Sequence, residues 1–422
     1  MRITFLVANY APSVGGAQMH VRRVAEGLAS RHGYEVEVLT TDAIHPPAGR
    51  HPGRIELREE RMGRVLVRRR PVARRTHAAL RGMRRAGRRL GVIRAIRPTP
   101  LAVGPLGAQL ARSAWEAGRR SDAVVGVGAP FLTLFAADRS TRRASAAYLA
   151  MPLLHLGAES LRPWALRSLR RADGCTSSTE YERSWLVANG VAADRISVLP
   201  PGCDPERFPD VDPVAARRHL GLAERPTVGY IGRLAAHKGI DTLYDAARRV
   251  WETRPDTTLL IAGGVAGWDG FEPLTDRLRD HADDRLVIRR DFEEGDRAML
   301  LSACDVVAFP SREESFGMVT LEGWCARRPV VVADIPPVRS LVRNGVDAEL
   351  VPVGDDAALA RVIAELLADP DRRTSLAVEG RRRAEVEFAW DRIVDRWDGF
   401  VRESVGRRRA STSIPRSPRK VS

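Results

Sequence analysis

The sequence predicts an α/β protein of two domains, each built on a doubly wound parallel sheet. At 422 residues the chain is longer than a single hydrophobic core usually supports. In both halves, short apolar runs typical of buried strands alternate with stretches of helical periodicity. The segment 200–213, near the middle of the chain, is rich in proline and is typical of a linker.

The first half opens with apolar runs at Ile3–Val7 and Val36–Leu39, which have the length and composition of strands. Between them, apolar residues recur at helical spacing on one face, which predicts a strand–helix–strand unit with parallel strands. These residues are Ala17, Val21, Val24, Ala25 and Leu28.

The second half repeats this alternation more clearly. Helical patterns separate its apolar runs, and one of them contains Leu243, Ala247, Val250 and Trp251. We therefore expect a second parallel sheet. Its predicted strands are Val228–Ile231, Thr258–Ala262, Leu286–Ile288, Val306–Phe309, Val330–Val332 and Leu350–Val351.

Composition predicts a protein that stays in the cytoplasm. Hydrophobic residues make up 44% of the chain and charged residues 29%, as in ordinary globular proteins. The first apolar run is too short for a secretory signal, and no stretch approaches the roughly 20 apolar residues of a membrane span. The cysteines lie far apart without CxxC spacing, so we expect free thiols and no zinc site. They are Cys175, Cys203, Cys304 and Cys325.

The net charge of +15 comes almost entirely from arginine, because Lys238 and Lys420 are the only lysines. The codon bias of a GC-rich genome would explain this, and so would an anionic partner. Within residues 74–97, Leu80, Met83, Leu90 and Ile93 recur at helical spacing among arginines. This segment is either a basic amphipathic helix that lies on an anionic membrane or a surface helix packed on the sheet. No nucleic-acid partner is expected.

The strongest motif runs from Pro310 to Val331, where a predicted strand ends and a helix begins near Gly317. Ligands bind at the carboxyl ends of strands in open parallel sheets. The first amide groups of the helix would face a phosphate or sugar hydroxyls, and Glu314 and Glu322 would accept hydrogen bonds from hydroxyls. Alternatively, Glu314 caps the helix and Glu322 is solvated. The first amide groups of the helix belong to Phe316, Gly317, Met318 and Val319, and Ser315 is a further candidate for donor binding.

Two further loops carry features suited to phosphate. Gly232 and Arg233 follow a strand, and Lys238 follows in the same loop, so that two cations could bind a diphosphate. Gly15 and Gly16 follow the first strand and let the backbone approach a ligand closely. The glycine pair is not the GxGxxG fingerprint, which argues against a plain NAD enzyme.

Together these segments resemble the retaining GT-B glycosyltransferases of the GT4 family. The E-x7-E motif corresponds to Glu314 and Glu322, the G-R-x4-K-G loop to Gly232–Gly239, and the glycine loop to Gly15 and Gly16. Residues 201–208 resemble the hinge phrase of the family. Trp390 resembles the start of the final helix, which crosses back onto the N-terminal domain.

The resemblance implies a domain plan and a reaction. Residues 1–208 would form an acceptor-side domain and residues 209–388 a nucleotide-sugar-binding domain. Residues 389–405 would return as a helix, and 406–422 would be a disordered basic tail. A sugar would pass from a donor such as a UDP- or GDP-sugar, with retention, to an acceptor that is a sugar, a small molecule or a lipid-linked group. Polysaccharide or glycolipid synthesis would fit, with the enzyme cytoplasmic or peripheral at the inner membrane face.

The resemblance also implies residue roles. Arg233 and Lys238 would neutralise the leaving diphosphate, so no metal is expected. Glu322 would bind the ribose, and Glu314 would hold the sugar together with the nearby amides. His155 corresponds to a histidine near the transferred sugar, although a core or loop histidine is its structural alternative. A nucleotide-sugar epimerase and a silent binder are the competing functions.

One departure from the family pattern bears on structure. Arg327 stands where glycine usually ends the helix after Glu322. Because glycine supplies a left-handed cap, we expect this helix to end differently.

Overall fold

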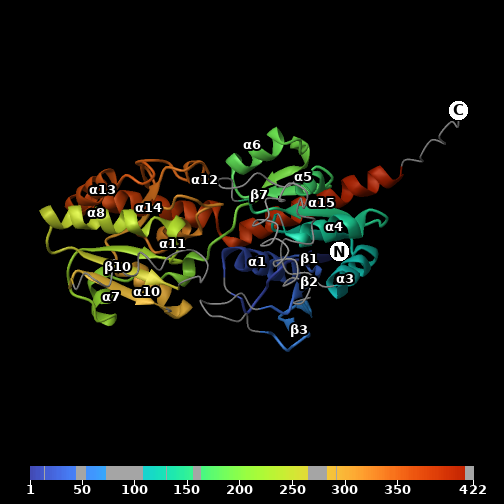
Figure 1. Ribbon diagram of the computed structural model, residues 1–422, viewed down its shortest axis with the longest axis horizontal. Coiled ribbons are helices and arrows are strands. Elements are labelled where there is room, and N and C mark those ends of the chain that lie inside the picture. The colour runs from blue at the N-terminus through green and yellow to red at the C-terminus, as the bar shows by residue number, and fades with distance from the viewer. Residues whose placement is uncertain are drawn as a thin grey trace, which may run out of the picture.

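The computed structural model describes residues 1–13, 15–43, 54–72, 108–129, 131–154, 163–264, 283–290 and 292–413. They form two sheet-centred domains side by side, and the final helix, α15 (Trp390–Ser413), runs from the C-terminal domain across the N-terminal one (Figure 1). The predicted class, two doubly wound α/β domains with a returning helix, is confirmed.

The sheet of the N-terminal domain has the strand order β3-β4-β2-β1-β5-β6-β7-β8. Its described pairs are parallel except β3 with β4, which is antiparallel. The strands are β1 (Arg2–Leu6), β2 (Glu35–Thr41), β3 (Glu59–Met62), β4 (Val65–Arg70), β5 (Ala123–Val127), β6 (Ala147–Met151), β7 (Gly174–Ser177) and β8 (Ile196–Val198).

Alternate residues of β1 enter two different hydrophobic clusters, one on each face of the sheet. Ile3 and Phe5 pack with α1 (Gly16–Arg31) and α15, whereas Leu6 packs with α3 (Ala108–Arg120) and α4 (Leu132–Thr141). In α1 the predicted apolar face is buried except for Ala17, which lies exposed in the first turn. The other helices here are α5 (Pro163–Leu169) and α6 (Glu180–Ala188).

The sheet of the C-terminal domain is wholly parallel, in the order β11-β10-β9-β12-β13-β14. This is the doubly wound 3-2-1-4-5-6 arrangement. Its strands are largely buried except β11, which is half-buried to exposed, so most of them read as continuous apolar runs, and each predicted strand overlaps an observed one. They are β9 (Thr227–Ile231), β10 (Thr258–Gly263), β11 (Leu286–Arg290), β12 (Val306–Phe309), β13 (Val330–Ala333) and β14 (Glu349–Val351).

Helices cover both faces of this second sheet (Figure 1). The predicted apolar face of α8 is buried against the sheet. The helices are α7 (Pro213–His219), α8 (Ile240–Thr253), α10 (Arg297–Ser302), α11 (Met318–Cys325), α12 (Pro336–Arg339), α13 (Asp356–Ala368) and α14 (Pro370–Glu387).

The two segments in which the chain passes from one domain to the other lie against each other. The amide of Cys203 donates to the carbonyl of Phe388 at 2.8 Å, and the amide of Trp390 donates to the carbonyl of Cys203 at 3.3 Å. Beyond this point α15 buries Trp397 and Phe400 on the N-terminal domain. A Cβ atom on Gly27 would lie 2.4 Å from Val394, so only glycine permits this close approach of α1 and α15.

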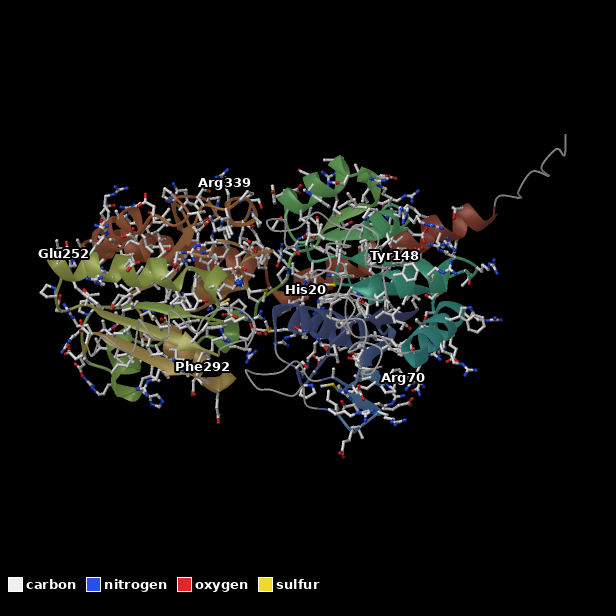
Figure 2. The ribbon with its side chains drawn as sticks, viewed as in Figure 1. His20, Arg70, Tyr148, Glu252, Phe292 and Arg339 are labelled. Atoms are coloured by element: carbon white, nitrogen blue, oxygen red, sulfur yellow. The ribbon has the colours of Figure 1, made fainter. Side chains whose placement is uncertain are left out.

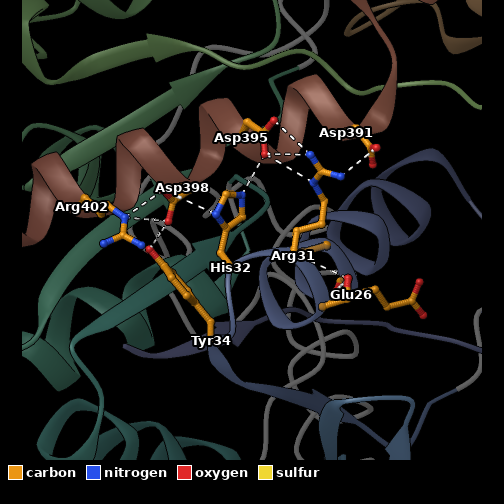
Figure 3. Close-up of polar contacts among 10 residues, drawn as sticks. Glu26, Arg31, His32, Tyr34, Asp391, Asp395, Asp398 and Arg402 are labelled. Atoms are coloured by element: carbon orange, nitrogen blue, oxygen red, sulfur yellow. Dashed lines mark hydrogen bonds and ion pairs between the residues drawn. The ribbon is translucent and has the colours of Figure 1, made fainter.

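Polar contacts flank the buried face of α15 (Figure 3). The guanidinium of Arg31 donates to Asp391 at 2.8 Å, and the hydroxyl of Tyr34 donates to Asp398 at 2.6 Å. Because several of these groups are exposed, they orient the helix more than they stabilise it.

The basic tail predicted from residue 406 onward is wrong for residues 406–413, which continue α15. Arg408 donates to the carbonyls of Thr141 and Ala144 at 2.8 and 2.9 Å, and Arg409 donates to Asp122 at 2.8 Å. These acceptors hold the arginine-rich end of the helix, an arrangement that composition does not reveal. Residues 414–422 lie outside the described residues.

Candidate functional site

The predicted phosphate and sugar loops leave their sheets at positions where the strand order reverses. In the C-terminal sheet, β9 and β12 are neighbours, and the loops that follow them carry Arg233, Lys238 and Glu314. In the N-terminal sheet, β1 and β5 are neighbours, and the loop after β1 carries Gly15. Such reversal points open a crevice beyond the strand ends.

Lys238 and Glu314 form an ion pair across the two loops of the C-terminal domain. The ammonium of Lys238 lies 2.7 Å from Oε1 of Glu314, and the side chains are 16% and 11% exposed. The hydroxyl of Ser311 donates to the same carboxylate oxygen at 2.9 Å. Glu314 is therefore not a helix cap, since the cap position of α11 is Gly317.

Backbone packing holds Lys238 beside Glu314. Gly239 has a left-handed φ of 69°, and a Cβ atom there would lie 1.9 Å from the carbonyl oxygen of Pro310. Only glycine lets the two loops approach so closely. The sequence identified Lys238 as a candidate cation, but it did not reveal this contact between the two loops.

Arg233 faces the N-terminal domain. A Cβ atom placed on Gly15 would lie 3.9 Å from Nη2 of Arg233. The buried hydroxyl of Tyr230 donates to the carbonyl of Arg233 at 2.7 Å and holds its backbone. Burial raises the pKa of this phenol well above its usual range, so it remains a neutral donor.

The first turns of α1 and α11 meet across the gap between the domains. A Cβ atom on Gly16 would lie 3.6 Å from Cγ of Met318 across this gap, and within the C-terminal domain one on Gly232 would lie 3.4 Å from Val319. Figure 2 shows His20 of α1 near this boundary. The first amides of each helix have no intrahelical acceptor, so these turns together suit an anion.

The start of α11 depends on its two preceding residues. Gly317 adopts a left-handed φ of 99°, which an L side chain rarely tolerates, and Phe316 is buried against Phe388 at a ring distance of 6.2 Å. The helix begins at Met318, as predicted. Ser315 remains half-buried between this anchor and Glu314.

Glu322 is held in an ion pair rather than solvated. Its Oε2 lies 2.9 Å from Nη1 of Arg297, and the two side chains are 15% and 19% exposed. Both residues line a pocket of about 280 Å³ between the domains. From the other side, the pocket is lined by Met19, Gly202, Cys203, Asp204, Arg207, Phe208 and Trp390.

Three polar residues of this region were missed by sequence reasoning. Ser311 and Arg312 lie within the predicted Pro310–Val331 motif, so their position was a usable signal. Arg297 lies at the first position of α10 and has no motif around it. Its sequence neighbourhood is that of a surface arginine, and folding alone places it at Glu322.

Two predicted features lie outside the described residues, namely His155 and the basic segment 74–97. The four cysteines are free, as predicted, and all of them are buried. In the described ranges, the structure contains no cluster of acidic, cysteine or histidine side chains suited to a metal ion. None of the described helices is both long and apolar enough to cross a membrane.

The expectation that Arg327 ends α11 differently is wrong. Arg327 itself adopts the left-handed conformation, with a φ of 55°. The amide of Arg328 donates to the carbonyl of Gly323 at 3.0 Å, which is the long-range bond of a Schellman cap. The backbone geometry of the glycine cap is therefore kept, and the arginine bears its steric cost.

Two family models match the chain. The model described as Glycosyltransferase Family 4 matches residues 14–207, and the model described as Glycosyl transferases group 1 matches residues 215–383. Together they cover both domains and all three predicted ligand loops.

Curated relatives match over part of their length. The chain is 35% identical to a D-inositol 3-phosphate glycosyltransferase of Xylanimonas cellulosilytica, over 52% of this chain and 54% of the relative. It is 32% identical to one of Stackebrandtia nassauensis, over 58% and 57%. The chain thus spans about half the length of the curated relatives it matches.

Solved structures match almost the whole chain. Sucrose-phosphate synthase of Thermosynechococcus elongatus has a TM-score of 0.73 and 20% identity, covering 95% of this chain and 98% of that one. Anabaena HepE in complex with UDP-glucose has a TM-score of 0.71 and 20% identity, covering 96% and 99%. At this identity the likeness shows the fold alone, and it confirms the predicted GT-B architecture.

Proposed function

Because the chain belongs to the glycosyl transferase group 1 family, of the GT4 type, we propose that it transfers a sugar from a nucleotide-diphosphate sugar to an acceptor, with retention of configuration. The observation that carries this proposal is the Lys238–Glu314 pair, which joins the loops after β9 and β12, together with Arg233, which lies in the first of these loops and faces Gly15 of the N-terminal domain. Such a site joins cations for a diphosphate to a carboxylate for sugar hydroxyls.

Donor binding would rearrange this pair. The diphosphate would attract the Lys238 ammonium and the Arg233 guanidinium, which neutralise the charge that grows as the leaving group departs. Glu314 would then accept hydrogen bonds from the sugar, assisted by the amides of residues 315–319. The backbone at Gly15, Gly16 and Gly232 would permit close approach of the donor.

The proposed reaction is a same-face displacement. The bond between the anomeric carbon and the diphosphate oxygen breaks, and a bond from the anomeric carbon to the acceptor oxygen forms. The acceptor proton passes to the departing phosphate. Arg233 and Lys238 would supply the cationic charge, so that no divalent metal is required. His155 would act on the acceptor side, near the transferred sugar.

We propose a UDP-sugar as the first donor to test, because HepE was solved with UDP and glucose and with UDP-glucose. A GDP-sugar remains the alternative. The relatives named D-inositol 3-phosphate glycosyltransferases favour a phosphorylated polyol acceptor. The other acceptor class is a lipid-linked sugar, as in polysaccharide or glycolipid synthesis at the inner membrane face.

The test begins with a thermal-shift panel of UDP-, GDP- and ADP-sugars, since a ligand of the folded state raises the apparent melting temperature. The stabilising sugar is then incubated with D-inositol 3-phosphate, with and without EDTA, and the product is analysed by NMR. A retained anomeric linkage with unchanged rate in EDTA is expected. An inverted linkage or a metal requirement would contradict the mechanism.

The same panel separates the competing functions. An epimerase would convert the nucleotide sugar without any acceptor, which proton NMR of the donor alone would reveal. A silent binder would be stabilised by nucleotide sugars but would release no nucleotide with any acceptor, including lipid-linked sugars. Either outcome would replace the transferase proposal.

Membrane association is a separate part of the proposal and rests on the sequence pattern of residues 74–97. Charge reversal at Arg81, Arg85 and Arg88 should release the protein from phosphatidylglycerol vesicles at low salt. Reversal of three arginines on other surfaces is the control. If the first variant binds vesicles as tightly as the unmodified protein, the segment is an ordinary surface helix.

A further inference from the structure

Glu322 and Arg297 form an ion pair in the interdomain pocket, and Arg297 supports Glu322 there. Glu322 lies on α11, two turns at most from the helix start, and Arg297 lies at the first residue of α10. Their side chains meet at 2.9 Å on the wall of the interdomain pocket. The two helices follow different strands, so this contact exists only in the folded domain.

Arg297 is itself held in place by an aromatic ring. Its guanidinium carbon lies 5.3 Å from the centroid of Phe292, within the range of a cation–π contact. Figure 2 shows Phe292 just beyond β11, at the end of the C-terminal domain that faces the N-terminal domain. A guanidinium confined between a ring and a carboxylate has little rotational freedom, so it restrains the carboxylate in turn.

The pair also adjusts the charge of the pocket. An uncompensated Glu322 would repel a nucleoside diphosphate, because both are anionic and the pocket is partly desolvated. Arg297 offsets this charge, and the carboxylate oxygens still accept hydrogen bonds. A carboxylate has about four acceptor positions, so a contact with Arg297 is compatible with hydrogen bonds from a diol.

We infer that Arg297 is a positioning residue that lets Glu322 distinguish a ribonucleotide from its 2′-deoxy counterpart. The inference rests on the proposed function and on the role that the family resemblance implies for Glu322, which would bind the donor ribose. A restrained carboxylate aligns with both ribose hydroxyls, whereas a mobile one adapts to the loss of one. Sites built to bind a hydroxyl reject ligands that lack it.

The experiment measures binding of UDP and 2′-deoxy-UDP by calorimetry to the full chain and to Arg297→Leu. If the thermal-shift panel selects another base, the matching ribo and deoxy pair is used. We expect the unmodified protein to prefer the ribonucleotide by about tenfold or more. In Arg297→Leu this ratio should fall toward one, and in Arg297→Lys it should recover only in part, because a lysine lacks the planar fork.

Further variants test whether Arg297 acts on the ribose preference through Glu322. In Glu322→Gln the ratio should fall as it does in Arg297→Leu, and the double variant should add nothing further. Arg249→Leu is the matched control, because Arg249 pairs with Asp356 at the surface, outside the residues lining the pocket. It should keep the full ratio. In turnover assays, Arg297→Leu should raise KM for the donor and leave kcat within about twofold.

The outcomes separate this inference from the proposed function. If no nucleoside diphosphate binds the unmodified protein, the proposed function fails. If UDP binds but Arg297→Leu keeps the ribose preference, or the unmodified protein has no such preference, only the inference is overturned. Circular dichroism of each variant verifies that a lost preference does not reflect unfolding.

Discussion

Nη2 of Arg312 lies 2.7 Å from Oδ2 of Asp241, and this contact ties the loop after β12 to the helix that follows the loop after β9. Nη1 of Arg312 donates to the carbonyl of Ala236 at 2.9 Å, and its amide donates to the carbonyl of His237 at 2.8 Å. Lys238 lies between these attachment points. Arg312 thus positions Lys238 beside Glu314 without contacting either side chain in the described structure.

Removal of the Arg312 side chain should impair sugar transfer more than it impairs folding. We expect Arg312→Ala to lower kcat/KM by about tenfold to a hundredfold, because small displacements of catalytic groups are costly. Steady-state kinetics and urea unfolding measure the two effects. Arg218→Ala is the control, since Arg218 of α7 makes an exposed pair with Glu224, outside the loops that carry the site. A charge swap of Arg312 with Asp241 should recover part of the activity, and an unimpaired Arg312→Ala would refute the role.

Glu314→Ala should nearly abolish transfer, by about a hundredfold or more, while nucleotide binding persists. The variant frees the Lys238 ammonium from its 2.7 Å partner, so affinity for the free nucleoside diphosphate should hold or rise. Calorimetry and a nucleotide-release assay measure both quantities. The neighbouring Glu313→Ala serves as control. Transfer at the unmodified rate would show that Glu314 is not part of the site.

Arg327 offers a test of backbone strain. A left-handed conformation costs an L residue roughly 1–2 kcal/mol, so Arg327→Gly should raise the free energy of unfolding by up to about 1 kcal/mol. Arg327→Val should lower it by a similar amount, because β-branched side chains tolerate this region least. The 3.5 Å contact with Asp210 is exposed and contributes little. Urea unfolding of the three proteins checks that the free energy of unfolding decreases from Arg327→Gly through the unmodified protein to Arg327→Val. A valine variant more stable than the unmodified protein would disprove the prediction.

His20 should make the protein sensitive to acid. It is buried between Trp390 and Trp397, and burial lowers the pKa of its imidazole to about 3. The unfolded chain takes up a proton near pH 6.5, so the free energy of unfolding falls as the pH drops from about 6.5 to about 3. Between pH 7 and pH 5 this loss amounts to about 2 kcal/mol.

His20→Phe removes this loss, and the measurement is the difference in urea midpoint between variant and unmodified protein across that pH range. The difference is needed because buried Glu182, whose pKa burial raises to about 7, acts in the opposite sense and stabilises the fold as the pH falls from about 7 to 4.5. His219→Phe, at an exposed position, is the control. A pH-independent difference for His20→Phe would contradict the assignment.

Much of the fold could be predicted because its signals are local. Continuous apolar runs identified the strands of the second sheet, and β12 was predicted at its observed limits, Val306–Phe309. The apolar face of α8 likewise follows from spacing alone. The end of α15 was predicted less well, because Arg408 looks like a solvated charge until the carbonyls of Thr141 and Ala144 are brought to it.

The candidate site was likewise predictable in part. The sequence by itself determined which loops carry Arg233, Lys238 and Glu314 and which helix carries Glu322, since a polar turn between a buried strand and a helix is a local pattern. Only the tertiary structure decided that Lys238 pairs with Glu314 and that Arg297 pairs with Glu322. Ion pairs depend on distances of a few ångströms between residues remote in the chain, and those distances exist only after the sheets and their helices have packed.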